Sequence, residues 1–387
     1  MNVFCLGGAG KICSEAVRDL VEYSNVERIT IGDPNTDAAH ILIDELGDDR
    51  IEYADIDITD KKRAVALLEG YDIVMDGTTI TLNEASTGSI AEAGCHGVNL
   101  NGFGAEYQFD AVFRGNDRIH VPGFGMTPGT TDMMVRFAAD QMETVEIVRV
   151  SHGAFRPIAF SPSIAETTIV EYDPNLADRV VFEDGEFKQV PPFARERVID
   201  LPEPYGSHPQ WIIPHSETRT VYEYLKDKGI RLIETRGTWP PKNMMLVRAL
   251  YEWGILHNEP IDVGGCEIGI MDAVSQYLQD SEVGTTTDLY GYALHVEVVG
   301  TKQGQKTQFT LTHTHPASNG SVVGWEGLRA YTRCVGIPLG IAVNLIAQGR
   351  SEGRGVVIPE RAFEPAEVFR ELEKRQILIH IAETALA

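Results

Sequence analysis

The sequence is poor in positive charge. Its 387 residues include 33 lysines and arginines against 57 aspartates and glutamates, a formal net charge of −24 at pH 7. Nucleic-acid backbones and anionic lipid headgroups both repel a protein of this charge. We therefore expect no nucleic acid and no membrane among its partners, whereas the same field would attract a cationic small molecule.

Cysteine is also scarce, and long apolar runs are missing. The five cysteines are widely spaced and form no CxxC pair, the pattern of reduced thiols in a cytoplasmic protein. A membrane-spanning helix needs about 18 consecutive apolar residues. The best candidate, Ile337–Ala347, is interrupted by Pro338, Gly340 and Asn344. These features favour a cytoplasmic protein that does not span a membrane.

Several motifs of metal and catalytic sites are missing as well. The chain has no HExxH zinc motif, no GxxxxGK[ST] phosphate-binding loop and no GxSxG nucleophile turn. His313 and His315 would point to one face of a strand, but no third ligand is near them in the sequence. We therefore expect no metal site.

Residues 1–125 alternate between short apolar runs and segments with helical spacing. The runs expected to form strands are Val3–Leu6, Arg28–Gly32, Ile51–Ile58, Asp72–Met75, Val98–Leu100 and Ile119–Val121. The segments expected to form helices are Lys11–Tyr23, Thr36–Leu46, Lys61–Leu68 and Asn83–Ala93. This alternation predicts an α/β domain over residues 1–125, a Rossmann-type doubly wound parallel sheet.

The pattern changes after residue 125 into a mixture of strands and longer helices. The expected strands are Val145–Val150, Arg231–Thr235, Ile261–Ile270 and a hairpin of Tyr292–Val299 with Thr307–His313. One expected helix starts at Thr127-Pro128. Four others are expected over Ser216–Leu225, Asn243–Trp253, Trp325–Ile346 and Pro365–Lys374. We predict a second α+β domain with a mixed sheet over residues 126–335, and a helical segment over residues 336–387.

A glycine-rich turn between the first strand and the first helix predicts a dinucleotide site. Gly8 and Gly10 permit a tight turn and close approach of a pyrophosphate, with Ala9, Lys11 and Ile12 beside them. Asp33 ends the second strand, where a carboxylate binds the adenosine ribose hydroxyls and repels a 2′-phosphate. The sequence therefore predicts NAD as the cofactor, with NADP less favoured.

Three more polar residues follow the expected strands at the same sheet edge. Asp57 would meet the adenine, or it is an ordinary loop carboxylate. Thr78 and Thr79 would contact the cofactor, or their hydroxyls cap the following helix. These alternatives are balanced.

Several stretches of the chain, in this order and spacing, resemble one known family. They are Leu6–Gly10, Asn83–Gly94, Val98–Gly102, Val121–Gly129, Arg236-Gly237 and Val322–Gly349. On these stretches the chain resembles the saccharopine-dehydrogenase-like oxidoreductases, most closely the lysine 6-dehydrogenase branch. One departure is Asn99, where the family commonly has an acid.

The resemblance implies an architecture and an activity. It implies a Rossmann domain, an α/β domain that binds substrate and mediates dimerisation, and a C-terminal segment that packs on the Rossmann domain. Members oxidise amines with NAD(P) or reduce imines. Asn101, Met126 and Pro128 lie within the resembling stretches, so we count them as cofactor-binding residues. The backbone amides of Pro122–Asp132 would hold the nicotinamide carboxamide or a substrate carboxylate.

The strongest candidates for catalysis lie just before an expected helix. His215 and Arg219 are four residues apart and would share one helix face. His215 would accept a proton, since its unperturbed pKa is about 6.5. Arg219 would clamp a substrate carboxylate. The alternative is a solvated helix start with an Arg–Glu pair.

Four further residues complete the candidate site. Arg236 would be a second anion clamp and Trp239 the wall of a pocket. Asp132 would face the site as a second catalytic residue, or it complements the helix dipole. Lys242 would bind substrate, although a surface lysine at a helix start is the favoured interpretation.

These features predict an NAD-dependent oxidoreductase that acts on the CH–NH group of an amine or amino acid. One alternative is an opine-like reductive condensation, in which an amine is joined to a keto acid or aldehyde. Another, of a different class, is a non-catalytic NAD-binding sensor or scaffold. We expect a small-molecule substrate and a homodimer or higher homo-oligomer.

Overall fold

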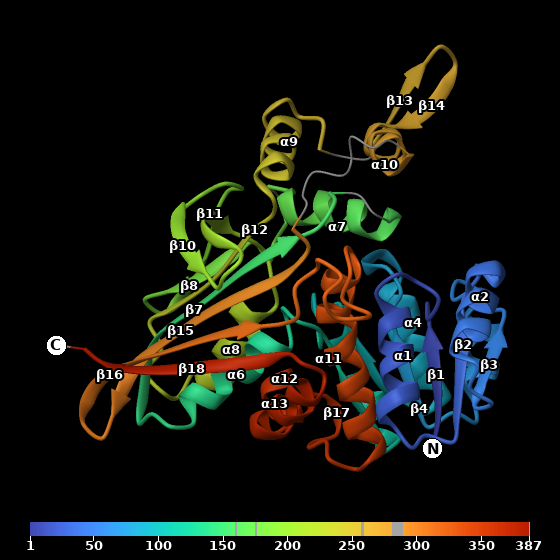
Figure 1. Cartoon of the computed structure of the whole chain (residues 1–387), viewed down its shortest axis with the longest axis horizontal. Helices are drawn as coiled ribbons and strands as arrows, with labels where there is room; N and C mark the ends of the chain where they lie inside the picture. Colours follow the sequence, from blue (N-terminus) through green and yellow to red (C-terminus); the bar gives the residue numbers. More distant parts are fainter. Residues whose placement is uncertain (159–160, 175, 257–258, 281–288, 387) are drawn as a thin grey trace. The chain divides into compact units, whose positions relative to one another are not determined.

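The computed structural model describes residues 1–158, 161–174, 176–256, 259–280 and 289–386. The chain divides into two compact units, coloured along the sequence in Figure 1. Unit 1 contains Met1–Phe137 and Thr332–Ile377. Unit 2 contains Ala138–Tyr331 and Leu378–Ala387.

Within the described residues, unit 1 is built on a seven-stranded parallel sheet with the order β17-β6-β5-β4-β1-β2-β3. The strands are β1 (Asn2–Leu6), β2 (Arg28–Gly32), β3 (Ile51–Ala54), β4 (Ile73–Asp76), β5 (His96–Asn99), β6 (Ile119–Val121) and β17 (Gly355–Val356). The chain order reverses between β1 and β4, which is the switch point of a doubly wound sheet. The predicted Rossmann-type fold is confirmed.

Short helices connect these strands and cover the sheet. They are α1 (Cys13–Tyr23), α2 (Thr36–Leu46), α3 (Lys61–Leu68), α4 (Asn83–Ala93) and α5 (Asp110–Gly115), with one-turn helices η1 (Ile80–Leu82) and η2 (Ala105–Phe109). Helices α3, α4 and α5 bury apolar residues in one cluster with Phe4 and Leu6 of β1. Asn35 and Asp60 cap α2 and α3 by accepting backbone hydrogen bonds. The local sequence therefore sets these helix starts.

The C-terminal part of the chain adds three more helices. They are α11 (Arg329–Ala347), which crosses the unit boundary, α12 (Pro359–Ala362) and α13 (Pro365–Lys374). Within unit 1, Gly336 and Gly340 let α11 approach α1, because a Cβ at Gly336 would lie 2.6 Å from the Ile12 carbonyl oxygen. Helix α11 is long and apolar enough to cross a membrane, but 83% of its most apolar window is buried within the protein.

Unit 2 has a mixed sheet, which in the part of the chain described here contains nine strands. The order is β10-β11-β12-β7-β15-β16-β18, with β8 paired to β12 and β9. The strands are β7 (Thr144–Phe155), β8 (Val180–Glu183), β9 (Glu186–Gln189), β10 (Arg197–Leu201), β11 (Gly206–Ile212), β12 (Leu232–Thr238), β15 (Gly291–Lys302), β16 (Gln305–Thr314) and β18 (Leu378–Ala385). Only the β12–β7 pair is parallel among the described pairs of this sheet. The predicted mixed sheet and the β15–β16 hairpin are confirmed.

The helices of the second half are α6 (Thr130–Ala139), which crosses the unit boundary, α7 (Pro162–Tyr172), α8 (Glu217–Leu225), α9 (Pro241–Glu252) and α10 (Ile270–Asp280). The start that we expected for α6, Thr127-Pro128, lies in the loop before it. The single strand expected over Ile261–Ile270 is wrong. Gly264 and Gly265, both at positive φ, split it into β13 (Pro260–Val263) and β14 (Cys266–Gly269).

The domain boundaries differ from those that we expected. The divisions follow Phe137 and Tyr331 rather than residues 125 and 335. The tail also divides, because β18 pairs with β16 and belongs to unit 2, whereas residues 332–377 belong to unit 1. The expectation that all of residues 336–387 return to the Rossmann domain is therefore wrong for the last strand. Its backbone hydrogen bonds are made with the mixed sheet instead.

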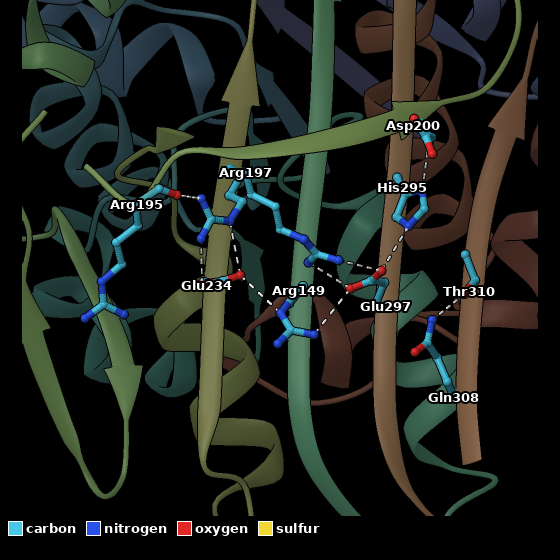
Figure 2. A network of polar contacts seen from close by, with 10 residues as sticks. Arg149, Arg195, Arg197, Asp200, Glu234, His295, Glu297, Gln308 and Thr310 are labelled. Atoms are coloured by element: carbon cyan, nitrogen blue, oxygen red, sulfur yellow. Dashed lines mark hydrogen bonds and ion pairs between the residues drawn. The ribbon is translucent and has the colours of Figure 1, made fainter. Parts of the chain in front are cut away.

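The two faces of the unit 2 sheet differ sharply. Val148, Val298 and Phe309 occupy neighbouring positions on one face and are buried. On the other face, Arg149 lies between Glu234 and Glu297 in the strand register. Figure 2 shows this polar face, where Glu297 also accepts hydrogen bonds from Arg197. The alternation along each strand therefore separates an apolar face from an ion-paired one.

Candidate functional site

The glycine-rich turn of unit 1 has the geometry that a bound pyrophosphate requires. Gly7 has a φ of +68°, and a Cβ there would lie 2.9 Å from the Gly77 carbonyl oxygen. A Cβ on Gly8 would lie 2.7 Å from the Cys5 carbonyl oxygen. Helix α1 begins at Cys13, directly after the turn. The bare backbone and the adjacent helix N-terminus fit a dinucleotide phosphate.

Asp33 connects the second strand to this turn. Its carboxylate accepts hydrogen bonds from the backbone amides of Ala9 (3.1 Å) and Asn35 (2.9 Å). The side chain is largely buried at the end of β2. Lys11 is exposed, and Ile12 is the residue before α1. The structure therefore brings the predicted residues Gly8, Ala9, Gly10, Lys11, Ile12 and Asp33 together at one sheet edge.

The residues after β3 and β4 make local contacts. The exposed carboxylate of Asp57 accepts hydrogen bonds from the Thr59 amide and hydroxyl, which lower its pKa. The hydroxyls of Thr78 and Thr79 bond to Ser86 and Thr81. Asp57 has the loop role that we had weighed as its alternative, whereas in the described part of the chain the Thr78 and Thr79 hydroxyls do not cap η1 or α4.

Asp76 is a residue that our sequence reasoning missed. It ends β4 in full burial, where its carboxylate accepts hydrogen bonds from the Ser86 hydroxyl (2.6 Å) and the Thr78 amide (2.9 Å). Burial raises its pKa. The signal was in the sequence, because an acid directly after a buried strand lies at the carboxyl edge where ligands bind.

The loop before α6 differs from our expectation. Six of its backbone amides already donate to acceptors within unit 1 and are not open to a ligand. The donors are Gly123, Phe124, Gly125, Gly129, Thr130 and Thr131. Met126 is buried and Pro128 follows a cis peptide bond. Asp132 is buried and accepts the Gly129 amide hydrogen bond at 2.7 Å, so its carboxylate caps its own helix.

A buried charged cluster of unit 2 is centred on His215. Its Nδ1 lies 3.4 Å from a Glu217 carboxylate oxygen and its Nε2 lies 3.7 Å from a Glu171 oxygen. Glu217 begins α8 and Glu171 lies in the last turn of α7. All three side chains are largely or fully buried. Two carboxylates thus enclose one imidazole away from solvent.

This environment changes the role that His215 can play. Burial by itself lowers the pKa of the imidazole, but Glu217 and Glu171 outweigh burial and raise the pKa to about 10. His215 is therefore an imidazolium at neutral pH and can donate a proton. The acceptor role that we predicted from its unperturbed pKa does not fit these surroundings.

A second histidine lies beside His215 in the opposite charge state. The rings of His152 and His215 are 5.3 Å apart and nearly perpendicular. Burial and the nearby His215 charge lower the pKa of His152 to about 3. Its Nδ1 is hydrogen-bonded to the Tyr292 hydroxyl at 3.1 Å. Gly237 makes room for this ring, because a Cβ there would overlap His152.

The other predicted substrate ligands of unit 2 are not part of this cluster. Arg219 is half exposed and ion-paired to Asp178 at 2.7 Å, while His215 precedes α8, so the two do not share a helix face. Arg236 is bound by both oxygens of Glu234, two residues before it on the same face of β12. Lys242 is exposed in the first turn of α9. The guanidinium charges of Arg219 and Arg236 are therefore used within the protein.

Trp239 lines a pocket, as predicted. The pocket has a volume of about 280 Å³, and Phe193, Trp211 and Met244 also line it. The Arg156 guanidinium lies 5.3 Å from the centre of a Trp239 ring. The Tyr172 ring is 5.5 Å from Trp239, and its neighbour in α7, Glu171, faces His215. The last turn of α7 therefore places one side chain beside Trp239 and the next against His215.

The two histidines considered for metal binding have protein partners. His313 Nδ1 accepts the Leu294 amide hydrogen bond at 3.2 Å, and His315 Nε2 is bonded to the Tyr205 hydroxyl at 2.7 Å.

The residues that sequence reasoning missed in unit 2 are Glu171, Glu217 and Tyr292. Glu171 is 44 residues from His215, so no local pattern links them.

Comparison with known proteins gives concordant results over nearly the whole chain. Residues 3–118 match the family model of the saccharopine dehydrogenase NADP binding domain, and residues 125–378 match that of the saccharopine dehydrogenase C-terminal domain. Saccharopine dehydrogenase (L-Glu forming) from Saccharomyces cerevisiae has the same fold, with a TM-score of 0.73 and 14% identity over 100% of both chains. Homospermidine synthase from Legionella pneumophila, solved with NAD, has a TM-score of 0.66 and 11% identity over 99% of this chain and 91% of that chain.

Proposed function

The chain belongs to the saccharopine dehydrogenase family, and from that premise we propose that it is an NAD-dependent oxidoreductase that acts on the CH–NH group of an amine or amino acid. The observation that carries this proposal is the buried arrangement of His215 between Glu171 and Glu217. A nicotinamide dinucleotide bound at the glycine-rich turn would accept or supply the hydride.

The charges of the cluster suit a nitrogen substrate. The Glu171 and Glu217 carboxylates bring negative charge to a buried place, and this charge attracts an ammonium or iminium group. During imine reduction, the His215 imidazolium donates a proton to the nitrogen. During amine oxidation, His215 can take up a proton only after it has lost its own, which its raised pKa favours at pH values well above neutral. The carboxylates stabilise the charged form in both directions.

Asp33 supports NAD as the preferred cofactor. Its carboxylate lies at the end of β2, where the adenosine ribose binds, and would repel a 2′-phosphate. The matching family model is described as an NADP binding domain, so the preference for NAD should be measured. We expect Asp33→Ser to raise the NADH dissociation constant about tenfold and to leave NADPH binding unchanged or improved. Equal binding of NADH and NADPH by the wild type would contradict the preference.

A second candidate function is the reductive condensation of an amine with an aldehyde or keto acid. The protonation of His215 at neutral pH favours it, because imine reduction consumes a proton at nitrogen. The fold likeness to homospermidine synthase supports it as well. This reaction would consume NADH only when both partners are present, whereas simple amine oxidation would produce NADH from one amine.

The experiment compares the wild type with two variants on a panel of diamines, amino acids and keto acids, followed at the NADH absorbance in both directions. Glu217→Gln removes one carboxylate of the cluster. Glu223→Gln makes the same change on the exposed part of α8 and is the matched control. We expect turnover with at least one amine, a loss of at least tenfold in Glu217→Gln and none in Glu223→Gln. NADH binding without turnover on the whole panel would favour a non-catalytic sensor.

Assembly and location complete the proposal. We propose a homodimer or higher homo-oligomer that acts on a small molecule in the cytoplasm, on the basis of the family resemblance and the scattered cysteines. Light scattering at micromolar concentration tests the assembly, since a monomer has a mass of 42.7 kDa.

A further inference from the structure

A buried polar network lies below the loops that follow β5 and β6 in unit 1. Its members are Asn83, Asn99, Glu106 and His120, and all four are at most 2% exposed. Glu106 belongs to η2, and the other three come from α4, β5 and β6. Four polar side chains from four elements therefore meet without solvent, which is costly unless their hydrogen bonds are satisfied.

Glu106 is the acceptor at the centre of this network. Its Oε1 accepts hydrogen bonds from Asn83 Nδ2 (2.8 Å), Asn99 Nδ2 (3.1 Å) and the Gly102 amide (3.0 Å). Its Oε2 accepts from the Gly104 amide at 3.1 Å. Each of these four partners is a donor, so a carboxylate fits here and a group with its own N–H does not. These bonds keep the pKa of Glu106 below its usual value despite burial.

The network holds two loops at the carboxyl edge of the sheet. Glu106 fixes residues 102–104 through their amides. Asn99 Oδ1 accepts the amides of Asn101 (3.1 Å) and Gly123 (2.9 Å), and so joins the loop after β5 to the loop after β6. The loops touch, because a Cβ on Gly123 would lie 3.2 Å from the Asn101 carbonyl oxygen.

Two polar atoms of this assembly, His120 Nδ1 and the Asn101 side-chain Nδ2, have no hydrogen-bond partner among the described residues. The Asn101 side-chain Nδ2 is buried, and it makes no hydrogen bond. A buried amide without a partner is costly, so its retention indicates a partner outside the chain. In a doubly wound sheet the two halves of a dinucleotide lie on opposite sides of the switch point. Asp33 marks the adenosine half above β2, so the half above β4, β5 and β6 receives the nicotinamide nucleoside.

We propose that Glu106 is a positioning residue for the nicotinamide half of the cofactor. Through Asn99 and the amides of Gly102 and Gly104, Glu106 holds Asn101 in the position from which the Asn101 carboxamide donates a hydrogen bond to the bound nucleotide. The inference rests on the dinucleotide site proposed above. Glu106 touches only the chain, and its effect on the cofactor passes through Asn101.

The arrangement also explains why position 99 carries an amide. An aspartate there would place a second carboxylate about 3.1 Å from Glu106, where the Asn99 Nδ2 now donates. Two buried carboxylates at that separation repel, and one would have to take up a proton. An exchange of acid and amide between positions 99 and 106 would keep one carboxylate and one amide in contact.

The test measures two ligands on four variants. NADH binding is followed by nicotinamide fluorescence, and AMP binding by calorimetry reports the adenosine half alone. The variants are Glu106→Gln, Asn99→Asp, the double exchange of both, and Glu84→Gln. Glu84 is exposed on α4 beside Asn83 and is the matched control for the loss of one charge.

We expect Glu106→Gln and Asn99→Asp each to weaken NADH binding roughly tenfold or more while AMP binding stays within twofold of wild type. The double exchange removes the second carboxylate but still sets an N–H of position 106 against the Gly102 or Gly104 amide, so it should bind NADH more tightly than Asn99→Asp but more weakly than the wild type. Glu84→Gln should match the wild type. Equal loss of AMP and NADH binding, or wild-type NADH binding by Glu106→Gln, would overturn the positioning role. A wild type that binds neither ligand would remove the dinucleotide site itself and this inference with it.

Discussion

The candidate sites of the two units use buried polar residues in different ways. In unit 1 the side chains at the carboxyl edge of the parallel sheet, such as Asp76, Asn99 and Glu106, hold backbone amides and shape loops. In unit 2 the buried charges of Glu171, His215 and Glu217 face one another. Polar side chains thus support backbone geometry at the first place, whereas at the second the side-chain charges set one another's protonation.

The tryptophans allow the units to be followed separately. All four, Trp211, Trp239, Trp253 and Trp325, belong to unit 2. Tryptophan fluorescence therefore reports on unit 2, while far-UV circular dichroism reports on both units. Differences between the two signals show which unit a substitution affects.

The largest effect should come from Arg375→Met in unit 1. The buried guanidinium binds both Asp19 oxygens and Glu371, and lies 4.1 Å from the Tyr23 ring centre. Its loss leaves Asp19 buried without its partner and should lower the free energy of unfolding by about 3–5 kcal/mol. Urea unfolding should show an early circular-dichroism transition with little change in tryptophan fluorescence. Arg370→Met, at an exposed site on the same helix, should have almost no effect.

Glu217→Gln should produce the next largest change, in the pH dependence of unit 2. The folded pKa of His215 is raised to about 10, so its stabilisation is complete below about 6.5 and is lost as the pH rises to 10. Removal of one carboxylate should move this loss about 1–3 pH units lower. The melting temperature, followed by tryptophan fluorescence from pH 6 to 10, measures this loss of stability without a substrate. Coincident profiles for wild type and variant would disprove the coupling.

Glu297→Gln tests the polar face of unit 2 at the acidic end. Hydrogen bonding from His295 and the charge of Arg197 hold the pKa of Glu297 at about 2. Because this folded pKa is depressed, the stabilisation is present above about 4.5 and is lost as the pH falls towards 2. At neutral pH the free energy of unfolding of the variant should be about 2 kcal/mol lower than that of the wild type, and below pH 3 this difference should become smaller. If the difference in the free energy of unfolding stayed constant over this pH range, the effect would come from packing instead.

The smallest expected effect is a gain in stability from Gln210→Met. Gln210 is fully buried in β11, and neither side-chain polar atom has a partner among the described residues. A methionine of similar length removes this desolvation cost and should stabilise the protein by about 1 kcal/mol. Gln189→Met is the control, because its amide bonds to two carbonyl oxygens. A lower melting temperature for Gln210→Met would show that the amide has an unseen partner.

The units also differ in how much of each could be predicted. In unit 1, β2, α2, α3, α4 and β6 have the predicted bounds, because each strand pairs with neighbours through a short helical connection. In unit 2 the segment 180–212 forms four strands that were not predicted. These strands are short, and β8 pairs with β12 about 50 residues later. The pairs β8–β9 and β10–β11 are local, and the Asp184-Gly185 turn of the first is a hairpin signal that our sequence reasoning missed.

The sequence by itself determined the Rossmann unit, its glycine-rich turn and Asp33, since these depend on backbone freedom and on spacing within one βαβ repeat. Only the tertiary structure decided the state of His215, because Glu171 reaches it from another helix and burial strengthens their interaction. It also decided that Arg219 and Arg236 are bound to Asp178 and Glu234 rather than open to a substrate. The sequence specifies the type of each side chain. The charge of that side chain, and whether it is available to a ligand, depend on which distant groups the fold places around it.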